Sequence, residues 1–158
     1  MKNLLFLFLF SVLITSCVPQ AITVKDFEKI IDMNNSKDEL YIKTNEWFVE
    51  TFNSAESVIE FQDKEAGKII GKYVLNDITQ GLYIYNIKQT ISIDIKEGKV
   101  RIVIKDPYEK ATGSVLGGEP YNHNYSPLSS QKRLSILRLE WDELSKSLEK
   151  RLNENSDW

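Results

Sequence analysis

The succession of apolar patterns along this chain predicts an α+β protein with two layers, in which both helices lie on one face of an antiparallel sheet. Three observations lead to this prediction. One strand-like segment precedes a helix with an aromatic stripe, four strand-like segments follow that helix, and an amphipathic helix comes last. Each helix has one apolar stripe and the sheet has one apolar face, so packing them together buries all these surfaces. The expected order is therefore β-α-β-β-β-β-α.

The first strand and the first helix are predicted before Asn53. The segment FEKIIDM (27–33) is rich in β-branched and apolar residues, which is typical of a strand. Ser36 and Glu39 have the spacing of a capping box, so a helix is expected to begin near Lys37. Apolar residues then recur at helical spacing and form a stripe for packing on a sheet, namely Leu40, Tyr41, Trp47, Phe48 and Phe52.

Four strands are predicted at residues 57–62, 68–75, 82–95 and 99–105. The third alternates Tyr and Ile with polar residues, which is the pattern of a strand with one buried face and one face in water. The last two strands flank Glu97-Gly98, a turn that predicts a hairpin. The polar face of this hairpin is a candidate contact surface and carries Lys88, Thr90, Ser92, Asp94, Arg101 and Lys105.

The stretch DKEAGKIIGK has some features of a phosphate-binding loop, but its glycines are one residue too close, and Tyr73 stands where that loop needs a Ser or Thr. We interpret its residues as structural. Asp63 is expected to accept hydrogen bonds from turn amides, and Gly67 to adopt a positive φ where the chain reverses. Gly71, inside a strand, is expected to make room for a large neighbour, such as an aromatic side chain of the first helix.

Residues 107–129 hold three of the four prolines and are expected to form a long connection without regular structure. From about Ser130 a second helix is predicted, because six apolar residues recur at spacings of three and four: Leu134, Leu137, Trp141, Leu144, Leu148 and Leu152. This stripe fits packing on the sheet, and a short coiled-coil seam is the alternative.

The first seventeen residues indicate export and lipid attachment. Lys2 precedes an apolar run that is too short to span a bilayer, and the length and flanks are those of a signal peptide. The ending ITSC resembles the lipobox of bacterial lipoproteins, which implies a diacylglyceryl group on Cys17 and cleavage before it. Cys17 is the only cysteine and so has no disulfide partner within the chain. A signal peptide with a chance cysteine is the alternative.

The expected organisation is a signal peptide at residues 1–16, a lipidated tether at 17–25 and a single domain at 26–155. Removal of the signal peptide leaves 19 basic and 23 acidic residues, a net charge of −4. No basic cluster stands out, so nucleic acid is not expected as a partner. Val18 follows the cysteine where some inner-membrane lipoproteins have an aspartate, which favours the periplasmic face of an outer membrane.

The candidate contact residues lie in EPYNHNYSP. Tyr121, His123 and Tyr125 combine aromatic surface with polar groups, which suits contact with a ligand or partner. His123 is the only histidine, and without a nucleophile or orienting carboxylate nearby it forms no recognisable catalytic set. We therefore expect a non-catalytic binding or assembly module of the cell envelope with no cofactor or metal. The alternative is an envelope hydrolase or other enzyme that uses His123.

The segments DELYIKTNEWFVETF and VIEFQDKEAGKIIGKYVL resemble a bacterial family known as domain of unknown function 4468, with a TBP-like fold. Trp47 matches the family's helix, while Asp63, Gly67, Ile69 and Gly71 match its D-x-x-x-G-x-I-x-G turn. The resemblance covers about residues 25–106 and implies the β-α-β-β-β-β-α order. It also implies export or lipid anchoring, which is frequent among members, and it brings no catalytic residues.

Overall fold

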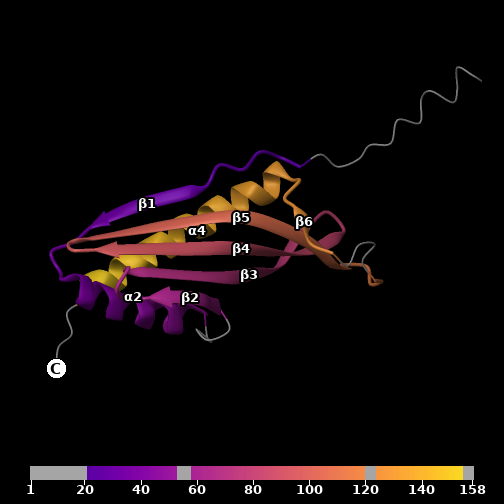
Figure 1. Cartoon of the computed structure of the whole chain (residues 1–158). Coiled ribbons are helices and arrows are strands. Elements are labelled where there is room, and N and C mark those ends of the chain that lie inside the picture. Colours follow the sequence, from indigo (N-terminus) through magenta and orange to yellow (C-terminus); the bar gives the residue numbers. More distant parts are fainter. Residues whose placement is uncertain (1–20, 53–57, 120–123, 155–158) are drawn as a thin grey trace, which may run out of the picture.

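The computed structural model describes residues 21–52, 58–119 and 124–154 (Figure 1). Cys17, Tyr121 and His123 lie outside these residues. Within them, one antiparallel sheet has the strand order β1-β5-β4-β3-β2, and a short β6 pairs with β5. The strands are β1 (Phe27–Asp32), β2 (Ile59–Asp63), β3 (Lys68–Gln80), β4 (Tyr83–Lys96), β5 (Lys99–Ser114) and β6 (Ser126–Pro127). The helices are α2 (Lys37–Phe52) and α4 (Gln131–Asn153).

The predicted two-layer α+β arrangement is confirmed, because α2 and α4 pack on the same face of the sheet. Aromatic rings join the layers: Phe48 and Tyr73 both pack against Phe52, while Trp141 packs against Phe27 of β1. The helices also contact each other, since Trp47 Nε1 donates a hydrogen bond to Ser147 Oγ at 2.8 Å. The apolar stripe of α4 therefore belongs to the core and not to a coiled coil.

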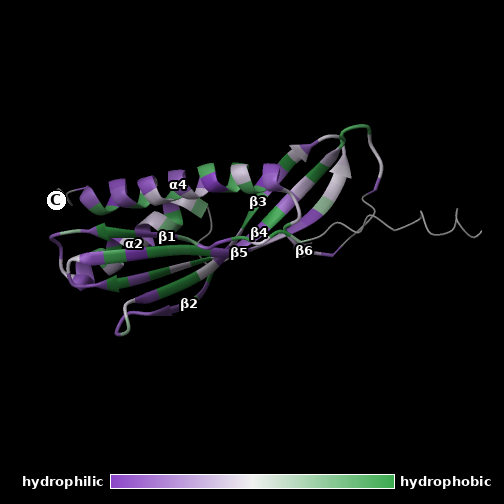
Figure 2. Ribbon diagram, turned by 90° about the horizontal axis from the view of Figure 1, so that it is seen from above, coloured by the Kyte–Doolittle hydropathy of each residue, from purple (hydrophilic) through white to green (hydrophobic). Residues whose placement is uncertain are grey.

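The inward side of β4 supplies much of the core. Ile87, Ile91, Ile93 and Ile95 are buried, and their neighbours on β5 are Val100, Ile102 and Ile104. Figure 2 shows these alternating apolar positions as green bands along the strands. Burial of apolar surface at this layer contact supplies the main driving force for folding. No helix among the described residues has the length and apolar character needed to span a bilayer.

The expectation of an irregular connection at 107–129 is wrong for residues 107–114 and 126–127, which form strands. β5 continues to Ser114 and pairs with β4 as far as Tyr83, and β6 pairs with β5 at Tyr108 and Glu109. Pro107 lies at an irregularity of the ladder, where a missing N–H is tolerated. The alternation of apolar and polar residues that predicts a strand is missing here, because the charged Glu109 occupies an inward position of β5.

At one end of the sheet, β3, β4 and β5 extend past the other strands and form an arm (Figure 1). Two ladder irregularities bring residues into the left-handed region, Asp77 with φ of 59° in β3 and Asp106 with φ of 54° in β5. An extra residue in one strand bends it and increases its twist. The arm therefore begins at these two irregularities.

Candidate functional site

A hollow opens on the helix-free face of the sheet beside the irregularity of β5. Lys88 pairs with Tyr108 and Thr90 pairs with Lys105, so Asp106 and Pro107 together stand opposite Gln89. The extra residue displaces the strand and leaves an open volume of about 420 Å³. The hollow is lined by Lys72, Lys88, Gln89, Thr90, Asp106, Tyr108 and Tyr125.

Tyr125 reaches this hollow through β6. Tyr108 of β5 pairs with Lys88 on one edge and with Pro127 on the other, so β6 holds Tyr125 beside the outer face. The Lys88 ammonium lies 4.7 Å from the centre of the Tyr125 ring, a cation–π contact. Tyr125, one of the candidate contact residues from the sequence, thus meets Lys88 and Thr90 of the polar sheet face here.

Lys88 differs from three other cations of this face, which pair with carboxylates. Lys72 pairs with Glu60 at 2.9 Å, Lys68 with Asp94 at 2.6 Å, and Arg101 with the same Asp94 at 2.7 Å. Lys88 has no ion pair with any carboxylate in the part of the chain that the structure describes. Its charge is therefore available to an incoming anionic group, and Tyr108 and Tyr125 flank it with aromatic surface.

The described residues contain no group of three or more His, Cys, Asp or Glu side chains placed to hold a metal ion. The lining of the hollow offers two ammonium groups, a hydroxyl, an amide, a carboxylate and two phenols. These groups suit hydrogen bonding and charge recognition of a bound molecule. Sequence reasoning did not single out Asp106 or Tyr108, because their approach depends on the strand irregularity.

The turn between β2 and β3 lies at the opposite end of the sheet from the arm (Figure 1). Asp63 Oδ1 accepts a hydrogen bond from Ala66 N at 2.9 Å, and Gly67 has φ of 66°. The Gly67 carbonyl accepts a hydrogen bond from Ile95 N at 2.7 Å, so the turn is joined to the end of β4. Asp63 and Gly67 thus form a tight structural turn.

Helix α2 covers Gly71. A Cβ on this residue would lie 2.8 Å from the carbonyl oxygen of Val58 and 3.4 Å from Cε1 of Phe48 in α2. An aromatic side chain of the first helix therefore lies over the strand at this glycine. The close approach depends on the absence of a side chain.

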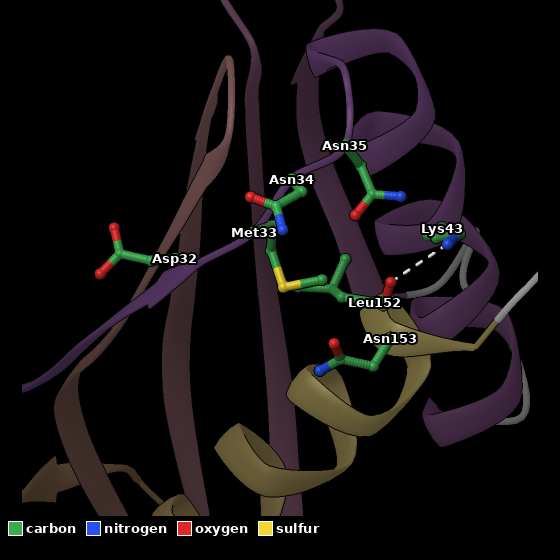
Figure 3. Close-up of a pocket in the computed structure, with 7 residues that line it drawn as sticks. All are labelled: Asp32, Met33, Asn34, Asn35, Lys43, Leu152 and Asn153. Carbon is green, nitrogen blue, oxygen red and sulfur yellow. Dashed lines mark hydrogen bonds between the residues drawn. The ribbon is translucent and has the colours of Figure 1, made fainter.

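A second hollow, of about 290 Å³, lies between the β1–α2 connection and the end of α4 (Figure 3). Lys43 is buried there, and its ammonium donates to the carbonyls of Leu152 and Glu154 at 3.1 and 2.7 Å. It also pairs with Glu39 at 3.0 Å. These contacts satisfy the cation and cap the last turn of α4, so this hollow offers less to a ligand than the first.

A polar cluster lies between α4 and the sheet. Tyr73 Oη donates a hydrogen bond to Glu140 Oε2 at 3.0 Å, and Trp141 Nε1 donates to the buried Gln89 Oε1. Burial raises the pKa of Glu140 to about 7, although the hydrogen bond from Tyr73 acts in the opposite direction. Burial beside Glu140 also raises the pKa of Tyr73, which keeps the phenol protonated. Apolar periodicity gave no sign of this cluster.

Comparison with known proteins decides the family. Residues 27–110 match the model of the family described as "Domain of unknown function (DUF4468) with TBP-like fold". The chain belongs to this family. The match begins at β1 and ends within β5, so it includes the turn at Gly67 and the irregularity at Asp106. No curated protein matches the chain.

Two solved structures share the family's fold. The chain is similar to a DUF4468 family protein from Bacteroides ovatus, with a TM-score of 0.55 and 14% identity over 87% of this chain and 93% of that one. It is also similar to a TBP-like protein from Parabacteroides distasonis, with a TM-score of 0.54 and 13% identity over 81% of this chain and 96% of that one. At these identities the likeness concerns the fold alone.

Proposed function

We propose that this protein is a lipid-anchored, non-catalytic binding module of the cell envelope. The anchor would be a diacylglyceryl group on Cys17, in keeping with the lipobox-like ending ITSC. Val18 after the cysteine favours placement on the periplasmic face of an outer membrane. The binding site would be the hollow on the helix-free face of the sheet.

The observation that carries the binding role is the position of Lys88. Its ammonium lies in a hollow of about 420 Å³, held over the Tyr125 ring, while Lys72, the other cation that lines the hollow, is paired with Glu60. A half-buried cation gains free energy from a ligand anion, because the low-dielectric surroundings strengthen the attraction. The hollow therefore favours a ligand or partner segment with a carboxylate or similar anion beside a flat or apolar group.

Photo-crosslinking in intact cells tests this role. A photoreactive phenylalanine analogue is placed at Tyr108, which is 42% exposed in the wall of the hollow. The matched control carries the same analogue at Leu139, which is 69% exposed on α4. We expect a discrete crosslinked product from position 108 and none of that mass from position 139. The same products from both positions, or none from position 108, would contradict the proposal.

A further inference from the structure

The far end of the arm carries a group of exposed apolar side chains, here called the apolar tip. It consists of Leu82, Tyr83, Val115 and Leu116, which are 53%, 51%, 51% and 77% exposed. Val115 N donates a hydrogen bond to Leu82 O at 2.9 Å, so the two connections at this end form one surface. Figure 2 shows the hydrophobic colouring at the end of the arm.

The apolar tip lies beyond the cover of the helices and is free of charge. Arg133 in the first turn of α4 contacts Gln80 and Tyr85, so α4 begins level with these residues and the tip projects past them. Residues 78–87 and 111–118 contain no Asp, Glu, Lys or Arg, although such residues make up 27% of the chain. An exposed apolar patch of this kind marks a contact surface.

The described chain begins at the same end of the molecule. Ile22 N donates to Leu128 O at 3.0 Å, and Leu128 N donates to Pro107 O at 3.1 Å. The first described residues therefore contact the rest of the domain next to Pro107, at the base of the arm. Figures 1 and 2 both show the first described residues and the arm at one end, with the C-terminal end of α4 opposite.

The length of the tether limits how far a membrane can lie from the tip. Cys17 precedes Ile22 by five residues, which span at most about 18 Å when fully extended. The arm from Tyr108 to Ser114 advances by six residues, or about 20 Å in a strand. A lipid on Cys17 therefore keeps the bilayer surface within about 18 Å of Ile22. The tip extends about 20 Å from Tyr108 and can reach a surface at that distance.

We infer that the apolar tip inserts into the lipid–water interface as a second membrane contact beside the lipid on Cys17. This inference rests on the proposed lipid anchor. Leucine and valine gain from burial among acyl chains, tyrosine favours the interfacial region, and a surface without charge loses little on dehydration. The contact orients the domain, with the arm pointing to the bilayer and the Lys88 hollow about 20 Å above it.

Fluorescence quenching by lipid tests the contact. Leu116→Cys is made in the full chain, where lipidation of Cys17 leaves the new thiol as the only reactive one, and an environment-sensitive fluorophore is attached. The lipidated protein is reconstituted into phosphatidylcholine vesicles with or without brominated acyl chains. The matched control is Lys64→Cys, in the β2–β3 turn at the opposite end, where the lysine side chain is 55% exposed. Brominated lipid should reduce emission about twofold at position 116 and leave position 64 unchanged.

The outcomes separate this inference from the anchor. Mass spectrometry of the N-terminal peptide reports whether Cys17 carries lipid in the same sample. If Cys17 is lipidated and positions 116 and 64 respond alike, the tip contact is overturned and the anchor stands. If Cys17 carries no lipid, the anchor fails and the tip inference fails with it.

A charged variant checks that the protein and not the dye enters the bilayer. Val115→Asp in the labelled Leu116→Cys chain places a carboxylate next to the label and should abolish the quenching. Quenching that persists in this variant would overturn the inference, because it would show that the fluorophore inserts by itself.

Discussion

Arg133 and Glu109 form a bidentate ion pair between the first turn of α4 and the arm. Arg133 Nε lies 2.7 Å from Glu109 Oε2, Arg133 Nη2 lies 2.6 Å from Glu109 Oε1, and the two residues are only 4% and 5% exposed. Ser129 Oγ also donates to Glu109, and the guanidinium stacks on the Tyr85 ring at 3.8 Å. This pair fixes α4 against the arm that carries both the hollow and the tip.

Breaking that pair on one side should destabilise the fold strongly. Glu109→Leu leaves the Arg133 charge buried without compensation, and the free energy of unfolding should fall by about 3–5 kcal/mol in urea denaturation. The double variant Glu109→Leu with Arg133→Met removes both charges and should recover at least half of that loss. A double variant less stable than Glu109→Leu alone would contradict the assignment of the loss to an uncompensated buried charge.

Gly67 and Gly81 should respond differently to alanine although both have positive φ, of 66° and 61°. A Cβ at Gly67 would overlap the carbonyl oxygen of Ile95, whereas nothing lies within 4 Å of one at Gly81. Gly81→Ala should lower the free energy of unfolding by about 1 kcal/mol through backbone strain alone. Gly67→Ala should lower it by about 3 kcal/mol or more. Thermal unfolding of the two variants measures the difference. Equal losses of stability would show that the turn at Gly67 shifts to accommodate the added Cβ at little cost in free energy.

Glu140 should make stability depend on pH. Burial raises the pKa of Glu140 from 4.5 to about 7 in the folded chain, so the folded state binds more protons than the unfolded state between these two values. The contribution of Glu140 is fully present below pH 4.5 and is lost as the pH rises through 7. The loss should be about 1–2 kcal/mol, less than the full shift implies, because the side chain keeps contact with water.

Glu140→Gln isolates this effect because glutamine keeps the shape and can still accept the hydrogen bond from Tyr73. The variant should match the natural chain near pH 4.5 and exceed its stability at pH 8. Subtracting the two urea-unfolding profiles cancels the other titrating groups. A difference that does not change between pH 4.5 and 8 would mean that Glu140 titrates normally.

The lipid anchor has its own test. In the natural chain, radioactive palmitate supplied to growing cells should be incorporated, while Cys17→Ala should abolish the incorporation and release the protein from membranes. Lys132→Gln, an exposed change in α4 that leaves the lipobox-like ITSC untouched, serves as a control for expression. Incorporation of label into the Cys17→Ala chain would refute lipidation at this residue.

Periodicity is sufficient to predict the layers and insufficient to predict the site. Ile91 and Trp141 lie where the apolar pattern of their elements predicts them, because burial of one apolar face determines how both the sheet and the helices pack. The arm has no such pattern, because its inward position holds Glu109, whose burial depends on Arg133 from a distant helix. The meeting of Lys88 and Tyr125 likewise depends on pairing between β5 and β6, which sequence spacing does not reveal.

The most direct measurement of the central claim is the yield of the crosslink from position 108 when the charge of Lys88 is changed. Lys88→Gln should reduce the yield about tenfold, since it removes one charge-assisted contact of about 1.5 kcal/mol. Lys88→Arg should keep most of the yield. Lys132→Gln, the same charge change at an exposed position of α4, should leave it unaltered. An unchanged yield in Lys88→Gln, or an equal fall in Lys132→Gln, would contradict recognition through the hollow.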